Sequence, residues 1–337
     1  MSTSQNPEEV FNSYNIIQET FKTIGSHEIQ TAILVPKSLV PGYCHPFIYH
    51  LHGGYLVTGH ALFAPFFDKW VHKLALENDA IIVSSNYRLL PSSDGMGDVL
   101  EDVADGWQWT KTELPKVMEK KFPRIELDFN QILLAGSEAG GYYAIHLNIF
   151  YPEDFDCLAL VSPLIDIYDR PFENGPGPGE PNVLDWPYKL MPNPENTQSW
   201  IEEASQTPVT RAGFERMPFF VAACQHMMFT PRLVDPNRRY RRRELRLLDL
   251  VRVGNNLAKS IWIMQGQDDS FISIRASDEF VRLVGKRPDT TVRYDVIPGQ
   301  GHGFDFDDAI WESDQAVEAL EFVTQAWGFD SDLEQDD

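Results

Sequence analysis

The chain has 337 residues, of which 43% are hydrophobic, and its formal net charge is −22. This composition supports a folded core and excludes wholesale disorder. The negative charge makes nucleic acids unsuitable partners, because polyanions repel one another. No apolar run approaches the ~18 residues of a membrane span, the N-terminus does not resemble a signal peptide, and three widely spaced cysteines do not suggest a disulfide framework. We therefore expect a cytoplasmic protein of one large domain or two small ones.

The first half of the chain alternates between short apolar segments and longer amphipathic ones. The short segments predict β-strands, and the longer segments have the apolar spacing of α-helices. We predict strands over residues 28–36, 46–54, 80–89, 131–136 and 157–165, and helices over residues 67–79, 98–114 and 139–151. Buried strands that alternate with helices favour a mostly parallel sheet covered by helices on both faces.

The alternation breaks after residue 165 and resumes near residue 258. The intervening segment is rich in proline and glycine, then apolar, and then strongly basic in "RRYRRRELR" at residues 238–246. We interpret this basic run as a solvated surface, or as an anion or partner contact near the substrate entrance. Strands at 260–266 and 291–299 and helices at 274–285 and 309–327 complete the pattern. We predict a core of residues 1–165 and 258–330, a lid at 166–257 and a disordered acidic tail at 331–337.

Three turn motifs follow predicted strands, at the edge where open α/β sheets place their sites. The first is "HLHGGYLVTG", in which backbone N–H groups around Gly53 and Gly54 can stabilise a developing oxyanion. The second is "GSEAGG" at residues 136–141, which has Glu138 at its centre. The third comprises Asp269 in "QGQDDSFI" and His302 in "PGQGHGF". A sharp turn followed by an acid and a histidine is the order of an α/β-hydrolase triad.

With "NYRLLP" at residues 86–91, these motifs resemble the α/β-hydrolase fold, and specifically its hormone-sensitive-lipase-like branch. The resemblance spans roughly residues 28–325. It implies a mostly parallel central sheet with helices on both faces and an inserted lid, and a catalytic site of Glu138, His302 and Asp269. Three departures stand out: Tyr55 replaces the last oxyanion glycine, the segment before the His-Gly-Gly turn is short, and Glu138 takes the place of the nucleophilic serine.

Four interpretations of the glutamate remain open. Glu138 could be inert in a ligand-binding pseudoenzyme, or Ser137 could be the nucleophile of a turn shifted by one residue. The protein could also be a hydrolase, either with Glu138 as a covalent nucleophile, as the aspartate is in epoxide hydrolases of the same fold, or with esterase-like activity. We prefer a fourth interpretation, in which Glu138, His302 and Asp269 form a proton relay. Such a relay suits isomerisation, elimination or dehydration, or cyclisation, with the oxyanion held at the His-Gly-Gly turn.

We expect a cofactor-independent enzyme of specialised metabolism that acts on a bulky, apolar small molecule. Simple aryl esters should then be poor substrates. No ligand set for a metal is evident, and homodimerisation stays open. Beyond the catalytic residues and Gly53 and Gly54, we predict that the pocket includes Tyr55, Ala139, Tyr142, Trp186 and Phe229.

Overall fold

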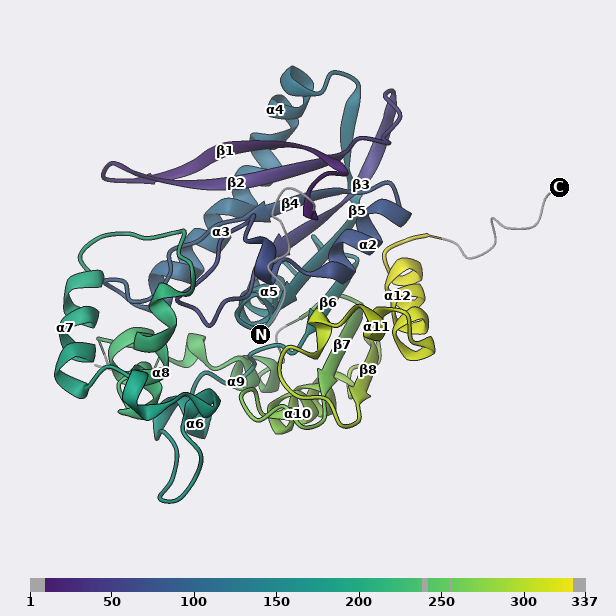
Figure 1. Ribbon diagram of the computed structural model, residues 1–337. Coiled ribbons are helices and arrows are strands. Elements are labelled where there is room, and N and C mark those ends of the chain that lie inside the picture. The colour runs from purple at the N-terminus through teal and green to yellow at the C-terminus, as the bar shows by residue number, and fades with distance from the viewer. Residues whose placement is uncertain (1–9, 238–241, 255, 330–337) are drawn as a thin grey trace.

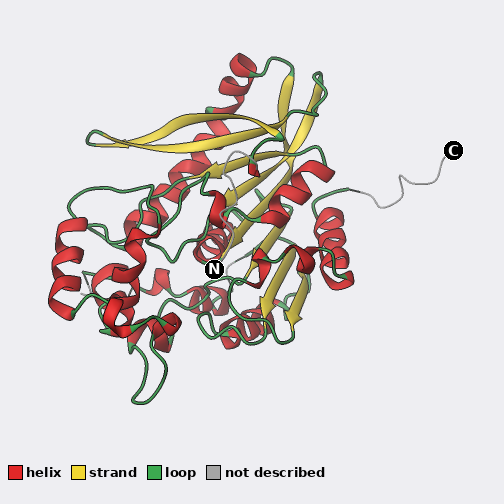
Figure 2. Cartoon of the chain, in the orientation of Figure 1, coloured by secondary structure: helices red, strands yellow, loops and turns green. Residues whose placement is uncertain are grey.

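A computed structural model describes residues 10–237, 242–254 and 256–329 of the chain. In these residues an eight-stranded sheet forms the centre of the molecule (Figure 1 and Figure 2). The strands are β1 (Tyr14–Ile24), β2 (His27–Pro36), β3 (Tyr43–Leu51), β4 (Ile81–Ser85), β5 (Ile125–Ser137), β6 (Cys157–Val161), β7 (Ser260–Gly266) and β8 (Thr291–Ile297). All the predicted strands are present, and β1 is an additional strand that the sequence analysis did not identify.

The sheet is mostly parallel, which confirms the predicted fold class. Its strand order is β1-β2-β4-β3-β5-β6-β7-β8. Strands β1 and β2 form an antiparallel hairpin, β2 also pairs antiparallel with β4, and the other neighbouring pairs are parallel. The carboxyl ends of β3, β5, β7 and β8 therefore meet at one edge, and the turns that follow them come together there.

Helices cover both faces of the sheet, because successive strand residues point to opposite sides. On one face, α2 and α12 pack with Ile48 and Ala135, whereas α3, α5 and α10 pack with Phe47 and Leu134 on the other. The predicted last helix is divided into α11 and α12. The helices are α2 (Lys69–Glu77), α3 (Met96–Thr112), α4 (Leu114–Lys121), α5 (Ala139–Phe150), α6 (Arg170–Glu173), α7 (Pro194–Ala204), α8 (Met217–Gln225), α9 (Leu247–Arg252), α10 (Ile274–Val284), α11 (Asp308–Trp311) and α12 (Asp314–Ala326).

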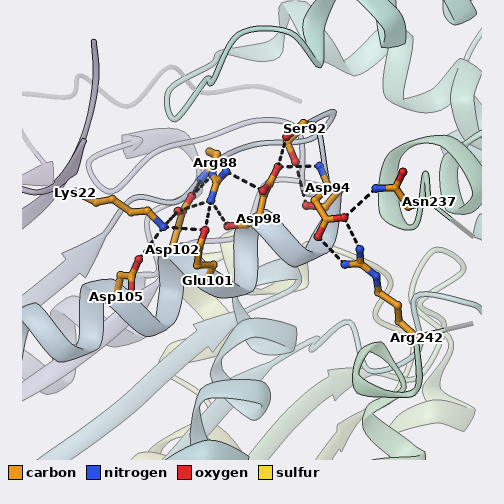
Figure 3. Close-up of polar contacts among 12 residues, drawn as sticks. Lys22, Arg88, Ser92, Asp94, Asp98, Glu101, Asp102, Asp105, Asn237 and Arg242 are labelled. Atoms are coloured by element: carbon orange, nitrogen blue, oxygen red, sulfur yellow. Dashed lines mark hydrogen bonds and ion pairs between the residues drawn. The ribbon is translucent and has the colours of Figure 1, made fainter. Parts of the chain in front are cut away.

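The segment between β6 and β7 contains α6, α7, α8 and α9. Helices α6, α7 and α8 lie together beside the sheet (Figure 1). The division into a core and a lid stays a prediction, and the predicted acidic tail lies outside the described residues. Residues 238–241 of the basic run also lie outside them, but Arg242 forms an ion pair with Asp94, in the turn before α3 (Figure 3).

The "NYRLLP" motif places Arg88 in a network of carboxylates on α3 (Figure 3). The Arg88 side chain is only 8% exposed, and its guanidinium lies 2.7 Å from Asp102 and 2.8 Å from Asp98. The carboxylate of Asp102 is fully buried and also pairs with Lys22 of β1, at 2.8 Å. The motif therefore joins the end of β4 to α3 and to the edge hairpin.

Arg88→Met is expected to lower the free energy of unfolding by about 3–5 kcal/mol, because it leaves the buried carboxylate of Asp102 without its main partner. Urea denaturation followed by circular dichroism measures the change. The control is Lys116→Met, since the Lys116 side chain is 70% exposed in its ion pair with Glu113. The control should change stability by less than about 0.5 kcal/mol. Equal changes for the two variants would contradict the structural role of Arg88.

Candidate active site

Glu138 occupies a sharp turn between β5 and α5. Its backbone has φ 51° and ψ −115°, a conformation that costs energy for any residue other than glycine. The turn is also very close to β3, because a Cβ atom at Gly140 would lie 1.8 Å from the carbonyl oxygen of Leu51. Only glycine fits there, so the flanking glycines centre the turn on Glu138.

The Glu138 carboxylate binds the backbone of the turn that follows β3. Its Oε2 accepts hydrogen bonds from the N–H groups of Gly54, at 2.8 Å, and Tyr55, at 2.7 Å. Gly54 has φ 127°, and a Cβ atom there would lie 2.1 Å from the carbonyl oxygen of Thr58, so this turn requires glycine. The N–H groups of this turn, predicted to bind a substrate oxygen, therefore bind a side chain of the protein itself. They belong to Gly54 and Tyr55, whereas the prediction named Gly53 and Gly54.

Asp269 and His302 form a hydrogen-bonded pair on the turns after β7 and β8. His302 Nδ1 donates to Asp269 Oδ2 at 2.9 Å, and Asp269 Oδ1 accepts from the N–H groups of Phe271, at 3.0 Å, and Ile272, at 2.8 Å. The carboxylate thereby fixes the imidazole and leaves Nε2 as the nitrogen available for proton transfer.

The electrostatic surroundings favour the protonated form of His302. Burial acts to lower the pKa of the imidazole, but the hydrogen bond and charge of Asp269, together with the charges of Glu138 and Asp305, raise it above its ordinary value. An imidazole in this setting can take a proton from a bound molecule and hold it as a stabilised cation.

Ser137 belongs to a separate buried chain of hydrogen bonds. Its hydroxyl donates to Asp68 Oδ1 at 2.5 Å, and Asp68 Oδ2 lies 2.9 Å from His50 Nε2. His50 Nδ1 lies 2.9 Å from the hydroxyl oxygen of Ser84. Ser137 thus has a partner other than His302. Asp68 belongs to no recognisable motif, and no role was predicted for His50, the first residue of "HLHGGYLVTG".

The turns enclose a pocket that brings together five of the predicted site residues: Gly53, Gly54, Tyr55, Glu138 and His302. Asp269 lies behind His302 and does not line it. Three carboxyl groups face one imidazole in this pocket, and three aromatic rings complete its walls. The lining residues are Gly53, Gly54, Tyr55, Phe66, Asp68, Ser137, Glu138, Val161, Ser162, His302, Gly303, Asp305 and Phe306.

The structure places four other predicted residues outside the lining of this pocket. The Tyr142 hydroxyl donates to the carbonyl oxygen of Leu245 at 2.9 Å, and Ala139 is buried at the start of α5. Phe229 packs against other aromatic rings in the core, and Trp186 is half-buried at its periphery.

Ser162 is a pocket residue that the sequence analysis did not consider. It follows β6, is only 3% exposed and has φ 43°. Its hydroxyl is buried without a hydrogen-bond partner among the described residues, and the same is true of Glu138 Oε1. Strained backbone and unsatisfied polar atoms concentrate at functional sites. No motif in the sequence identifies Ser162, because its place in the pocket depends on where β6 ends in the folded sheet.

Two further features bear on the kind of site. Within the described ranges, no group of three or more histidine, cysteine, aspartate or glutamate side chains is arranged to hold a metal ion. No helix in the same ranges is long and apolar enough to cross a bilayer.

Comparison with known proteins revises the predicted chemistry. The chain is 27% identical over 296 residues to "Probable carboxylesterase M8" of Phoma sp., covering 85% of this chain and 88% of that one. It is 26% identical over 203 residues to "Probable carboxylesterase clz11" of Cochliobolus lunatus, covering 58% of this chain and 87% of that one. A solved esterase from Pyrobaculum calidifontis superposes with a TM-score of 0.59 at 17% identity, covering 95% and 87% of the two chains.

The predicted isomerisation, elimination or cyclisation by acid–base catalysis is therefore wrong, since the relatives are named carboxylesterases. The structure also lacks the predicted relay: Glu138 Oε2 binds the N–H groups of Gly54 and Tyr55, and within the described residues no hydrogen bond joins Glu138 to His302.

A family described as "alpha/beta hydrolase fold" matches residues 48–223, a range that contains the His-Gly-Gly turn, the "NYRLLP" motif and the Glu138 turn. The parallel sheet, the turn between β5 and α5, and the aspartate and histidine after β7 and β8 agree with this match. The chain is an enzyme of the α/β-hydrolase fold family, in its hormone-sensitive-lipase-like branch.

Proposed function

We propose that this protein hydrolyses a carboxylic ester by direct attack of a water molecule that His302 activates. One observation carries the proposal: the Asp269–His302 pair is complete, yet a carboxylate occupies the turn that faces it. A histidine held by a carboxylate is suited to remove a proton from a nucleophile. Water is the nucleophile that remains when the central position of the turn, Glu138, offers neither a hydroxyl nor a thiol.

Two alternative nucleophiles fit the geometry less well. The Ser137 hydroxyl donates to Asp68 and not to His302, so His302 is not positioned to remove its proton. Glu138 Oε2 is held by two N–H donors, which reduces its capacity to attack. Attack by Glu138 on an ester carbonyl would also form a mixed anhydride, a more reactive intermediate than the starting ester.

The buried polar atoms of the pocket define where a water molecule would bind. Glu138 Oε1 and Ser162 Oγ have no partner within the described structure, and both residues line the pocket with His302. In the proposed complex, water donates a hydrogen bond to His302 Nε2 and accepts one from the Ser162 hydroxyl. Its remaining lone pair is directed to the substrate.

The reaction then proceeds in two steps. The water oxygen forms a bond to the ester carbonyl carbon while His302 Nε2 takes its proton, which gives a tetrahedral oxyanion. The carbon–oxygen bond to the alcohol breaks as His302 returns the proton to the departing oxygen, and the products are a carboxylic acid and an alcohol. Asp269 stabilises the imidazolium between the two steps.

The proposal requires the ester carbonyl oxygen to displace Glu138 Oε2 from the N–H groups of Gly54 and Tyr55. These donors are suited to an oxyanion because they already bind a carboxylate oxygen at 2.8 and 2.7 Å. A displaced Glu138 can turn toward His302, whose cationic form its charge favours. The residue thus exchanges an interaction with the backbone for one with the reacting imidazole.

The position of an isotopic label tests this route. Hydrolysis of alkyl butyrates in ¹⁸O-water is expected to place one ¹⁸O atom in the butyric acid, and none in the alcohol or in Glu138. Mass spectrometry of the products and of the Glu138 peptide measures the outcome, and His302→Ala corrects for spontaneous hydrolysis. Label in Glu138 would show that the carboxylate is the nucleophile. A wild-type rate equal to that of His302→Ala across alkyl and aryl esters would refute the hydrolase itself.

A further inference from the structure

The pocket beside His302 has an unusual balance of charge. The carboxyl groups of Asp68, Glu138 and Asp305 line it, whereas no lysine or arginine does among the described residues. All three acidic residues are buried, with 4%, 7% and 8% of their surface exposed. The nearby Lys69 is directed to Asp308, at 2.6 Å, and to the carbonyl oxygen of Phe306. Among the described residues that line the pocket, three carboxyl groups are therefore accompanied by a single group that can be cationic, the imidazole of His302.

Aromatic rings form the outer wall of the same pocket. Phe66 and Phe306 stack with centroids 5.8 Å apart, and Tyr55 meets Phe66 at 6.2 Å. Phe306 is 47% exposed, which places it at the rim. Aromatic faces attract cations through their quadrupole, so the rim and the carboxyl groups beneath it favour the same kind of ligand.

One unsatisfied atom indicates that a polar ligand completes this pocket. Glu138 is 93% buried by the same measure, and its Oε1 lacks a hydrogen-bond partner in the described part of the chain. Buried polar atoms are rarely left unpaired, because each costs about 1–3 kcal/mol. This observation is independent of the number of acidic residues.

We propose that the pocket selects esters that carry a protonated amine, held between Asp305, Asp68 and the aromatic rings of Phe66 and Phe306. The inference rests on the proposed ester hydrolysis and specifies its substrate class. The ammonium group donates to the carboxylate oxygens while its alkyl substituents contact the rings. The ester group then extends toward His302, which lines the same pocket.

The raised pKa of Asp305 is consistent with a carboxyl group that lacks a cationic partner in the described part of the free protein. Burial, together with the charges of Asp68 and Asp269, raises the pKa of Asp305 to about 7, against the opposing effect of His302. A bound ammonium group would favour the ionised carboxylate and would therefore release a proton near neutral pH. The overall charge of −22 would also attract cationic substrates to the protein.

Two isosteric esters provide the test. We expect kcat/KM for 2-(dimethylamino)ethyl butyrate to exceed that for 3-methylbutyl butyrate by about tenfold, because the two differ chiefly in a charged nitrogen. Asp305→Asn should remove this preference. The control Asp307→Asn, at an exposed residue whose side chain caps α11, should retain it. Equal kcat/KM values for the two esters in the wild type would overturn the proposal.

Binding of the corresponding alcohols separates this inference from the hydrolysis itself. Calorimetry should show that 2-(dimethylamino)ethanol binds about tenfold more tightly than 3-methylbutan-1-ol, and that Asp305→Asn abolishes the difference. If the amino alcohol binds in this way while neither ester is hydrolysed, the ammonium site stands and the proposed hydrolysis fails. If both alcohols bind equally to the wild type, the ammonium site is refuted, whatever the catalytic result.

Discussion

Glu138→Ser is expected to give a conventional serine esterase that hydrolyses aryl esters about 10²-fold faster than the wild type. The substitution places a hydroxyl on the strained turn that faces His302, and it frees the N–H groups of Gly54 and Tyr55 for the oxyanion. Removal of the serine nucleophile from a serine hydrolase can lower kcat by about 10⁶-fold. A gain of about 10²-fold in Glu138→Ser therefore corresponds to only part of the rate that a serine nucleophile can supply. Initial rates with p-nitrophenyl butyrate measure it.

A fluorophosphonate probe identifies the new nucleophile. The probe should label residue 138 in Glu138→Ser and should leave the wild type unlabelled at Ser137, whose hydroxyl donates to Asp68. Glu138→Ala is the matched control, since it frees the same donors without supplying a nucleophile. A folded Glu138→Ser variant that neither reacts with the probe nor gains activity would show that Glu138 does not occupy a nucleophile position.

Asp269→Asn is expected to lower kcat for ester hydrolysis by ~10³–10⁴-fold while leaving the protein folded. The carboxylate accepts the Nδ1 proton of His302 at 2.9 Å and stabilises the imidazolium that forms during the reaction. An amide at this position weakens the charge stabilisation and can present its NH₂ group to Nδ1. The control is Asp268→Asn, one residue earlier and exposed, which should keep its activity.

The pH profile distinguishes this role from a structural one. His302 acts as a base in its neutral form, so kcat/KM should rise with pH through its pKa, which lies above the ordinary value of about 6.5. Loss of the Asp269 charge removes the largest influence that raises this pKa, so the midpoint should move to lower pH in Asp269→Asn. A midpoint that stays in place or moves upward would contradict the assigned electrostatics.

Much of the fold was predictable, because the strands that build it are apolar and are bounded by turn residues. Strand β7 coincides with its predicted range, and β5 begins earlier than predicted, in a half-buried or exposed segment where apolar and polar residues alternate. Strand β1 escaped prediction for a related reason. It lies at the edge of the sheet with mostly half-buried or exposed residues, so its sequence lacks the apolar run of a central strand.

The lining of the pocket was predictable where short motifs fix the backbone, as at Gly54, Glu138 and His302. It was not predictable where partners come from distant segments. Asp68 and Ser162 reach the pocket from the start of α2 and the end of β6, and neither position has a local pattern that signals a function. The occupation of the Gly54 and Tyr55 donors by Glu138 also depends on packing, because the turns that carry them are 83 or more residues apart.

The carboxylate of Glu138 resembles the product of the proposed reaction. A newly formed carboxylic acid would bind the N–H groups of Gly54 and Tyr55, the same two groups that Glu138 Oε2 occupies in the free protein. A tethered competitor acts at a high effective concentration, so Glu138 would return to its donors and expel the acid. Such an enzyme would show weak product inhibition, and its resting state would resemble the end of a catalytic cycle.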